Sequence, residues 1–140
     1  MKLPSYVKPY PKIWKLLPFV KEFGGNSIYP TIYLREDFYR DLLRDNPHLR
    51  SIALLKHEES HRKRQQEIGL LRFLLKNYFS RSARLEEELT AYQVSMQIWK
   101  KHGLEFPIEY LAKNLSGWMY LWATSYKNAR KKLEKMWEEA

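Results

Sequence analysis

The sequence predicts an α+β fold that is predominantly helical and holds one small sheet near the N-terminus. Residues 27–35 place their side chains in two alternating sets, with the two-residue period of a half-buried strand. Most of the chain after this stretch repeats its apolar side chains with the period of a helix. Because 44% of the 140 residues are hydrophobic and 15% are aromatic, the chain has enough apolar surface for a packed core.

We expect a single domain over residues 1–140, in three parts. Residues 1–26 form an extended N-terminal arm that is rich in proline and aromatic side chains. Residues 27–102 form the core that carries the candidate site. Residues 103–140 form C-terminal helices.

The strand at residues 27–35 is expected at the edge of its sheet, because Pro30 has no N–H to donate to a ladder. A lone strand is not stable, and the chain offers few obvious partners for this one. The N-terminal arm is therefore its expected partner. One short helical turn is predicted within the arm, at residues 13–17.

Six helices are expected after the strand. The first is short and amphipathic, around Phe38 to Leu43. The second begins at Asn46-Pro47, a capping residue followed by proline at the first helical position, and ends at Gly69. Either Ser80 or Ser82 caps the fourth helix. The third to fifth cover residues 70–79, about 83–102 and 107–114, and the fifth is ended by Ser116-Gly117.

The sixth helix is expected to pack an aromatic stripe into the core, with lysines on its opposite face. This helix is predicted to start directly after Gly117. The stripe consists of Trp118, Trp122, Tyr126, Ala129, Leu133 and Met136.

The second helix contains His57-Glu58-Glu59-Ser60-His61, an HExxH motif. Residues four apart lie one turn apart on the same helical face, so His57 and His61 can offer two imidazole nitrogens to one metal ion. Glu58 lies about 100° further round the helix, where its carboxylate can reach a water molecule on that ion. The alternative is two surface histidines that happen to be four residues apart. The other two histidines, at 48 and 102, are expected at the surface or at helix caps.

The fourth helix carries a carboxylate that needs a partner. Glu88 falls near the middle of the apolar arc of this helix, whereas Glu86 points to solvent and Glu87 lies at the edge of the arc. Burying a carboxylate costs free energy unless it is paired or bound to a metal. The partner of Glu88 is either a metal ion or a buried arginine, for which Arg84 is the nearest candidate.

The HExxH motif, followed on a later helix by the Glu-x-x-Ala pattern Glu88-Leu89-Thr90-Ala91, resembles the gluzincin group of zinc metallopeptidases. The resemblance covers roughly residues 27–102, and the short chain is similar to the single-domain minigluzincins. Three segments also resemble uncharacterised HExxH proteins of microbes and phages: His57 to Gln65, Glu88 to Ala91, and Leu115 to Gly117.

This resemblance implies a zincin-like core and one zinc ion per chain, held by His57, His61 and Glu88. It implies that Glu58 is the general base and acid that activates a zinc-bound water for peptide hydrolysis. It also implies that an extended peptide or an unfolded protein binds antiparallel to the edge strand. The strand residues expected there are Ile28, Tyr29, Thr31, Ile32 and Tyr33, and Tyr120 and Tyr126 are candidates for the hydroxyl that stabilises an oxyanion.

Several features depart from the gluzincin pattern. Glu59, Arg62 and Lys63 stand at positions that are usually uncharged, so the outer side of this helix should be solvated. Tyr92 replaces an acid that supports a ligand histidine in many gluzincins, and its hydroxyl could take over that support with a lower metal affinity. The sequence contains no recognisable clamp for a substrate terminus.

Composition restricts which side chains could bind a metal and indicates the expected cellular compartment. The chain has no cysteine, so a metal must be held by histidine and carboxylate, and disulfides are excluded. Lys15 and Pro18 interrupt the N-terminal apolar run, which does not fit a signal peptide, and no stretch is long enough to span a membrane. A cytoplasmic protein without a membrane partner is expected.

Two other functions stay open. The net charge of +9 fits a basic nucleic-acid-binding module that uses Arg62, Lys63, Arg64 and the basic face of the last helix. These basic residues are interleaved with acids and form no recognised motif. The other alternative is a zinc-binding protein without peptidase activity.

Access to the site is a separate question. The arm before Gly24 and the helix after Gly117 are not obviously needed by the unit from the HExxH motif to Glu88. One of these segments could lie along the strand where substrate is expected, so that the full chain is partly self-blocked. The alternative is that both segments complete the core.

Overall fold

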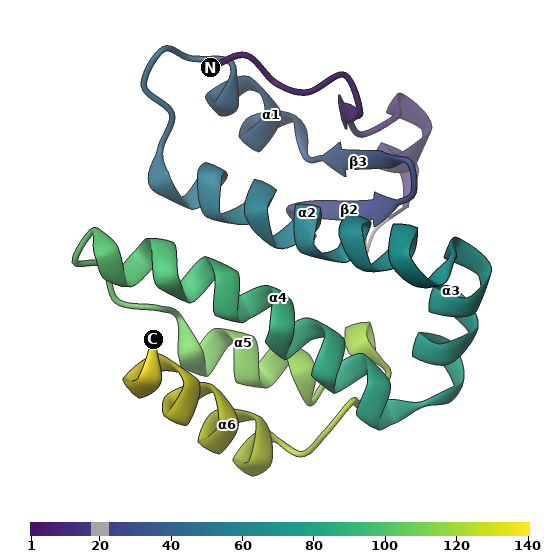
Figure 1. The fold of residues 1–140 in the computed structure, drawn as a ribbon, viewed down its shortest axis with the longest axis vertical. Helices are drawn as coiled ribbons and strands as arrows, with labels where there is room; N and C mark the ends of the chain where they lie inside the picture. Colours follow the sequence, from purple (N-terminus) through teal and green to yellow (C-terminus); the bar gives the residue numbers. More distant parts are fainter. Residues whose placement is uncertain (18–22) are drawn as a thin grey trace. The chain divides into compact units, whose positions relative to one another are not determined.

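The computed structural model describes residues 1–17 and 23–140 (Figure 1). Contacts divide the chain into two compact units, Met1–Leu70 and Leu71–Ala140, and each has a hydrophobic core of its own. The predicted α+β class and the predominance of helices are confirmed. That the two units fold together as a single domain stays a prediction.

The first unit combines a three-stranded sheet with two helices. The strand order is β1-β3-β2, with β1 parallel and β2 antiparallel to β3. The long helix α2 packs against β2, and α1 packs against α2 (Figure 1). The elements are β1 (Val7–Pro9), the 3-10 helix η1 (Lys12–Leu16), β2 (Gly25–Ile28), β3 (Thr31–Leu34), α1 (Glu36–Leu42) and α2 (Leu49–Ile68).

The single edge strand predicted at residues 27–35 is wrong. The chain turns at Tyr29-Pro30, where the peptide bond is cis, and the stretch belongs to two antiparallel strands. Proline has no N–H to donate to a sheet ladder, so it is tolerated both at a sheet edge and in a turn. Here Pro30 lies in the turn. The β2 strand occupies the sheet edge, and β3 is the central strand.

β3 pairs with β2 on one side, and backbone hydrogen bonds join its other side to the N-terminal arm. The N–H of Ile32 donates to the carbonyl of Tyr6 over 2.8 Å, and the Leu34 carbonyl accepts from the N–H of Tyr10 over 2.9 Å. Both bonds join β3 to the N-terminal arm. The arm is therefore the sheet partner, as predicted.

The arm also contributes to the core of the first unit. Val7 of β1 is buried against Ile32, Leu34, Leu42 and Leu55. The short turn predicted at residues 13–17 is confirmed as η1. β1 pairs with β3, which is part of the stretch from Ile28 to Leu34 along which the arm was expected. That the full chain is partly self-blocked stays a prediction. Residues 18–22 of the arm, which include Pro18 and Phe19, lie outside the described residues.

The HExxH helix α2 begins two residues later than predicted. Its N-cap is His48, whose Nδ1 accepts the N–H of Arg50 over 3.1 Å, so Asn46 is not the cap. The N–H of His48 donates in turn to Oδ2 of Asp41 over 2.8 Å. The predicted end is confirmed at Gly69, where φ is +88°, a value that favours glycine.

The second unit consists of packed helices. The helix α6 packs against both α5 and α4 around a core that includes Leu85, Met96, Leu115 and Leu133. Within the described residues, no helix is both long and apolar enough to cross a bilayer. The elements are α3 (Leu70–Phe79), α4 (Arg81–Lys101), α5 (Ile108–Leu115), the 3-10 helix η3 (Trp118–Tyr120) and α6 (Tyr126–Glu139).

Most predicted helix ends of the second unit are confirmed. The Ser80 hydroxyl accepts the N–H of Ala83 over 3.2 Å and caps α4, so Ser80 rather than Ser82 is the cap. His102 follows the C-terminus of α4, and its exposed ring contacts the carbonyl of Ile98. Ser116 caps the C-terminus of α5.

The last helix is shorter than predicted. Leu121 and Trp122 have φ values of +51° and +48°, in the left-handed region, and this break separates η3 from α6. Trp118 and Trp122 are consequently 58% and 57% exposed, so their predicted place in the core is wrong. The lower part of the stripe is confirmed, with Ala129 and Leu133 buried and Tyr126 and Met136 packed against them.

Candidate metal centre

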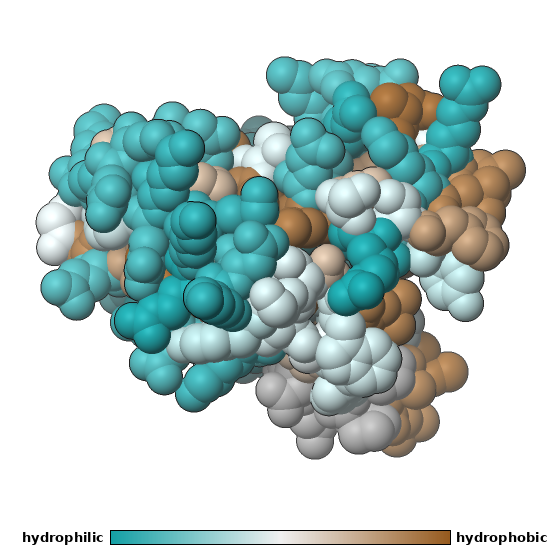
Figure 2. All heavy atoms as spheres, turned by 90° about the horizontal axis from the view of Figure 1, so that it is seen from below, coloured by the Kyte–Doolittle hydropathy of each residue, from teal (hydrophilic) through white to brown (hydrophobic). Residues whose placement is uncertain are grey.

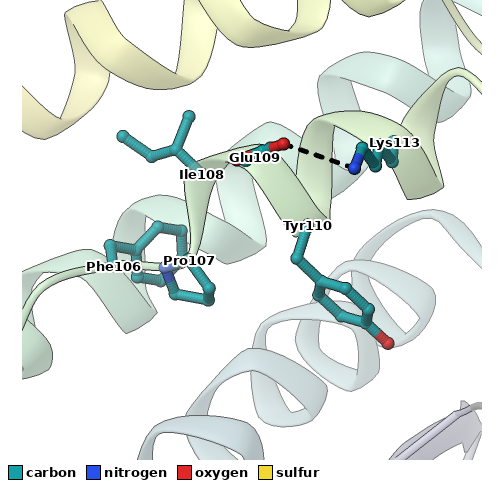
Figure 3. A pocket seen from close by; sticks show the side chains of 6 residues that line it. All are labelled: Phe106, Pro107, Ile108, Glu109, Tyr110 and Lys113. Carbon is teal, nitrogen blue, oxygen red and sulfur yellow. Dashed lines mark ion pairs between the residues drawn. The ribbon is translucent and has the colours of Figure 1, made fainter.

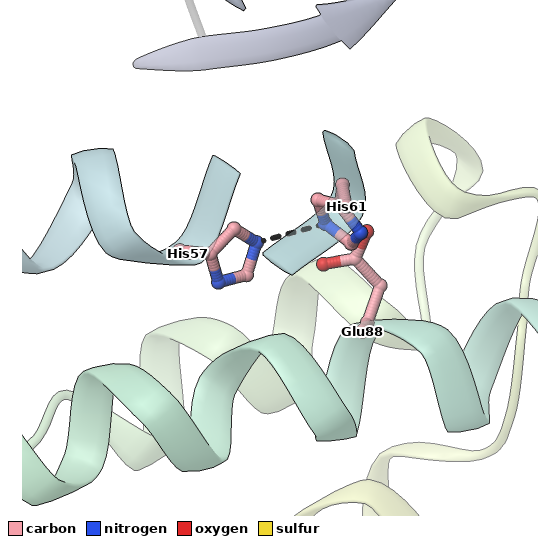
Figure 4. Close-up of side chains that lie close together, drawn as sticks. All are labelled: His57, His61 and Glu88. Atoms are coloured by element: carbon pink, nitrogen blue, oxygen red, sulfur yellow. Dashed lines mark hydrogen bonds between the residues drawn. The ribbon is translucent and has the colours of Figure 1, made fainter. Parts of the chain in front are cut away.

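Both histidines of the HExxH motif lie on the buried face of α2. His57 and His61 are each 7% exposed, and their Nε2 atoms are 3.1 Å apart (Figure 4). Their rings meet edge to face, with centroids 4.8 Å apart. The four-residue spacing produces this arrangement, because it returns to the same helical face after about one turn. The two imidazoles are therefore neighbours in a shielded environment.

The separation of the two nitrogens can be compared with zinc geometry. Two histidine nitrogens that each lie about 2.05 Å from a tetrahedral ion are about 3.3 Å apart. The observed 3.1 Å is close to this value. The same distance also fits a hydrogen bond in which one neutral ring donates to the other. The histidine pair therefore fits a shared ion, and a direct hydrogen bond is the alternative.

The third predicted ligand, Glu88, lies on α4. Its side chain is partly buried and its Oε2 atom is fully buried, whereas Glu86 is exposed, as predicted. Glu88 belongs to the second unit, whereas His57 and His61 belong to the first.

Arg84 is the alternative partner that the sequence offers for Glu88. Its guanidinium group donates to four backbone carbonyls, at distances from 2.6 to 3.2 Å. The acceptors are Asn77, Tyr78, Tyr120 and Leu121. Arg84 therefore ties together three segments of the second unit.

The motif glutamate, Glu58, is held against the edge strand β2. It is 5% exposed, and the Ser27 hydroxyl lies 2.8 Å from its Oε2 atom and 2.7 Å from its backbone oxygen. Gly25 provides the space, because a Cβ atom built there would lie 2.9 Å from Cγ of Glu58. The strand thus needs a small residue at 25 and a hydroxyl at 27 to hold this carboxylate.

A half-buried tyrosine, Tyr10, lies near the same carboxylate. Burial raises the pKa of the Tyr10 hydroxyl, and the negative charge of Glu58 raises it further. The Tyr10 hydroxyl donates to the carbonyl of Phe23 over 2.9 Å. Tyr10 is therefore a neutral hydrogen-bond donor at physiological pH and holds the segment that leads into β2.

Gln65 lies on the same face of α2 as His57 and His61. It lies one turn after His61 and is only 2% exposed. Its amide nitrogen donates to the carbonyl of Ser27 over 2.8 Å, and its amide oxygen accepts the N–H of Tyr29 over 2.7 Å. One side chain therefore satisfies two backbone groups of the sheet edge, as a neighbouring strand would. The sequence interpretation missed Gln65, although its four-residue spacing from His61 was a signal.

The predicted substrate strand needs correction. Among the residues proposed for it, only Ile28 belongs to the edge strand β2. Tyr29 lies in the turn, and its N–H is bonded to Gln65. Thr31, Ile32 and Tyr33 belong to β3, which has a neighbouring strand on each side. The strand with an outer edge in this part of the sheet is therefore β2, Gly25–Ile28.

The outer side of α2 is less solvated than predicted. Lys63 is exposed, but Arg62 is half-buried, with its guanidinium carbon 3.8 Å from the centroid of the Tyr6 ring. Arg62 also donates to the carbonyl of Pro30 over 2.9 Å. Glu59 accepts from the Tyr6 hydroxyl over 3.3 Å. These charged side chains anchor the arm and the β2-β3 turn, which the sequence pattern did not indicate.

The three tyrosines proposed as supporting groups all lie in the second unit. Tyr92 is buried, with its ring edge-on to that of Phe106 at a centroid distance of 6.2 Å. Tyr120 lies in η3, and Tyr126 opens α6 with its hydroxyl 3.5 Å from Nη1 of Arg130. Their roles in catalysis stay predictions.

An open hollow beside α5 is separate from the motif residues. Its wall includes an ion pair between Glu109 and Lys113, with a distance of 3.3 Å (Figure 3). The other lining residues are Phe106, Pro107, Ile108 and Tyr110. None of the predicted site residues lines this hollow.

Comparison with known proteins identifies no family for this chain. No protein-family model, curated protein or solved structure matches the chain significantly. The function is therefore inferred from the residues of the chain themselves.

Proposed function

We propose that the chain is a zinc-dependent metallopeptidase in which His57, His61 and Glu88 hold one zinc ion and Glu58 is the general base. The observation that carries this proposal is the buried histidine pair of α2, with Nε2 atoms 3.1 Å apart. Two histidines and a glutamate form a ligand set that leaves one coordination position of zinc open for catalysis.

The available donors favour zinc over other common cations. The chain has no cysteine, and two imidazoles with one carboxylate suit zinc better than magnesium or calcium, which prefer oxygen ligands. Bound zinc supplies a Lewis acid that acidifies water and polarises the carbonyl group of the scissile peptide bond.

Glu58 moves the proton in the proposed reaction. Its carboxylate accepts a proton from the attacking water and passes it to the leaving amine. The Ser27 hydroxyl already donates to Oε2, so we assign the proton transfer to Oε1. Burial of Glu58 limits competition from bulk water and keeps the carboxylate in one position.

The outer edge of β2 is the proposed binding surface for an extended peptide. The N–H of Arg35 donates to the carbonyl of Gly24, so the backbone groups of Gly24 point toward β3. In an antiparallel pair, successive residues point their backbone N–H and C=O groups alternately toward and away from the partner strand. The backbone groups of Gly25 and Ser27 therefore point away from β3. The Ser27 carbonyl is already bonded to Gln65. The backbone of a substrate peptide is therefore expected to hydrogen-bond to the backbone groups of Gly25. It is not expected to extend along β2 to Ser27, because Gln65 occupies the carbonyl there.

The test is the substitution Glu58→Gln, with Glu67→Gln as the control on an exposed part of the same helix. Zinc content is measured by elemental analysis, and turnover is measured on an unfolded protein such as reduced casein. We expect Glu58→Gln to retain zinc and to lose roughly two or more orders of magnitude in turnover, because the amide cannot accept the proton. The control should keep both properties.

Other outcomes point to the alternative functions. A wild-type chain that binds zinc and cleaves no unfolded protein would contradict the peptidase assignment and support metal binding alone. A chain that binds no zinc, but binds DNA or RNA with a steep salt dependence, would support the nucleic-acid alternative.

A further inference from the structure

The helix α3 presents an apolar face to solvent. Around its axis Phe73 is buried, Arg72 and Lys76 occupy a neighbouring arc, and a continuous arc of large apolar side chains is 47–77% exposed. Figure 2 shows hydrophobic side chains gathered on the right-hand side of the molecule, where Figure 1 places α3. The exposed apolar residues are Leu71, Leu74, Leu75, Tyr78 and Phe79.

A second set of exposed apolar side chains lies beside the C-terminal end of this helix. Arg84 joins the two segments, since it donates both to the carbonyls of Asn77 and Tyr78 in α3 and to those of Tyr120 and Leu121. The residues of the second set, which are 44–58% exposed, are Trp118, Leu121 and Trp122. We call the two sets together the α3 surface.

The loop that presents Trp122 is held in an unfavourable backbone conformation. Leu121 and Trp122 both have positive φ values, which residues with a Cβ atom rarely adopt. The N–H of Trp122 donates to the carbonyl of Gly117, and its carbonyl accepts from Nε of Arg81, both over 2.9 Å. The fold therefore fixes the backbone that carries this exposed indole, which is available to a partner.

The two segments that form the α3 surface carry charges of one sign only. Residues 70–84 contain Arg72, Lys76, Arg81 and Arg84 and no Asp or Glu, and residues 116–126 contain no charged side chain. Leu, Phe, Tyr and Trp together with basic side chains are the composition of helices that lie in the interface of anionic membranes.

We propose that the α3 surface binds the surface of a membrane that contains anionic phospholipids. The apolar arc enters the boundary between headgroups and acyl chains, and Arg72, Lys76 and Arg81 lie at the level of the lipid phosphates. The two exposed indoles, Trp118 and Trp122, suit this boundary because one edge of the ring is apolar and the other carries an N–H donor.

The proposed contact is superficial. The ten residues of α3 span roughly 15 Å, about half the hydrocarbon thickness of a bilayer, so this helix can lie on a membrane and cannot cross it. The expectation of no membrane partner was based on the absence of a spanning segment, and it does not extend to surface binding. The proposal is independent of the metallopeptidase assignment.

A second copy of the chain is a less suitable occupant. A two-fold dimer through the α3 surface would bring the basic rims of both copies together, and no acidic residue lies within residues 70–84 to pair with them. Repulsion between like charges opposes this dimer and favours an anionic lipid surface.

The experiment is co-sedimentation of the full chain with vesicles of phosphatidylcholine, with and without phosphatidylglycerol. We expect binding to the anionic vesicles that weakens as salt is added. The double substitution Leu71→Ser with Leu75→Ser should weaken binding at least about tenfold, because it removes two apolar side chains from the boundary. Arg72→Gln with Lys76→Gln should weaken it about thirtyfold, at about 1 kcal/mol per basic side chain.

Matched controls separate the α3 surface from general properties of the chain. Tyr110→Ser removes an exposed aromatic side chain on α5, and Lys131→Gln with Lys132→Gln removes two charges on α6. Both controls should bind as the wild type does, and far-UV circular dichroism checks that every variant is folded. As a second measurement, the fluorescence of Trp118 and Trp122 should shift to the blue with anionic vesicles, and Trp118→Phe with Trp122→Phe should abolish that shift.

Three results would overturn the proposal. The first is no binding to anionic vesicles by the folded wild type. The second is equal loss of binding in the α3 variants and in the controls. The third is a wild-type dimer that Leu71→Ser with Leu75→Ser converts to a monomer, without vesicle binding, which would identify the α3 surface as a contact between copies of the chain.

Discussion

The hydroxyl group of Ser27 lies 2.8 Å from Oε2 of Glu58 and 2.7 Å from the backbone oxygen of the same residue. A serine hydroxyl has one proton to donate, so the two acceptors share it. The contact joins residues 31 positions apart and fixes the HExxH glutamate against the edge strand. It therefore links the stability of the first unit to the position of the proposed base.

The first prediction concerns this contact. Ser27→Ala leaves a buried carboxylate oxygen with one donor fewer, so the free energy of unfolding should fall by about 1–3 kcal/mol in urea titrations. Under the proposed function, kcat should fall while KM changes little, because the side chain orients the base rather than the substrate. Ser27→Thr, which keeps the hydroxyl, is the matched control and should recover most of the kcat. An alanine variant with wild-type kcat would show that Ser27 has no positioning role.

The second prediction concerns the edge clamp formed by Gln65. Gln65→Leu has a similar volume but leaves the Ser27 carbonyl and the Tyr29 N–H without this partner. The unfolding free energy should fall by about 2–4 kcal/mol, because two backbone groups lose a buried partner. Hydrogen exchange at the Tyr29 amide should become faster. Gln66→Leu at the exposed neighbouring position should change stability by less than about 0.5 kcal/mol, and an equal effect of both substitutions would contradict the clamp.

The third prediction concerns acid stability at the start of α2. Hydrogen bonds from the Ser51 side chain and then from the backbone N–H of His48 hold the pKa of Asp41 below its usual range. Because the pKa of Asp41 is lower in the folded than in the unfolded chain, the ionised carboxylate stabilises the fold. This contribution is complete above about pH 4, the pKa of an unperturbed aspartate, and it disappears as pH falls through the pKa of Asp41 in the folded chain. Asp41→Asn should therefore destabilise the chain more at about pH 6 than at about pH 2.5.

Urea titrations of wild type and variant at several pH values test this sign. Asp45→Asn, at an exposed aspartate shortly after Asp41, is the control and should destabilise the chain less than Asp41→Asn at about pH 6. A destabilisation by Asp41→Asn that grows as pH falls would contradict the assignment.

Local features of the sequence predicted the parts of the fold that depend on local geometry. The four-residue spacing of His57 and His61 places both rings on one face of α2, and this follows from helix geometry alone. The glycine at 69 ends the helix because its positive φ suits few other residues. The helix from 70 to 79 was also predicted at its observed bounds.

The errors arise where one local pattern fits two structures. Pro30 fits a sheet edge and a turn equally well, so the hairpin of β2 and β3 was interpreted as one strand. The core stripe predicted from Trp118 onwards required one continuous helix. Leu121 and Trp122, whose backbones lie in the left-handed region, interrupt that helix. The bonds of Gln65 to Tyr29 and Ser27 join residues 36 and 38 positions apart, which no short pattern reveals.

We propose that one zinc ion binds through His57, His61 and Glu88, and elemental analysis of the purified chain measures this zinc content. The wild type should hold one zinc per chain, and His57→Ala, His61→Ala and Glu88→Ala should each lose most of it, because two remaining ligands hold zinc weakly. Glu86→Ala, at an exposed position on the same helix as Glu88, should retain the metal. A wild type without zinc after purification in its presence would contradict the claim, and zinc lost in Glu87→Ala but kept in Glu88→Ala would show that the third ligand is Glu87.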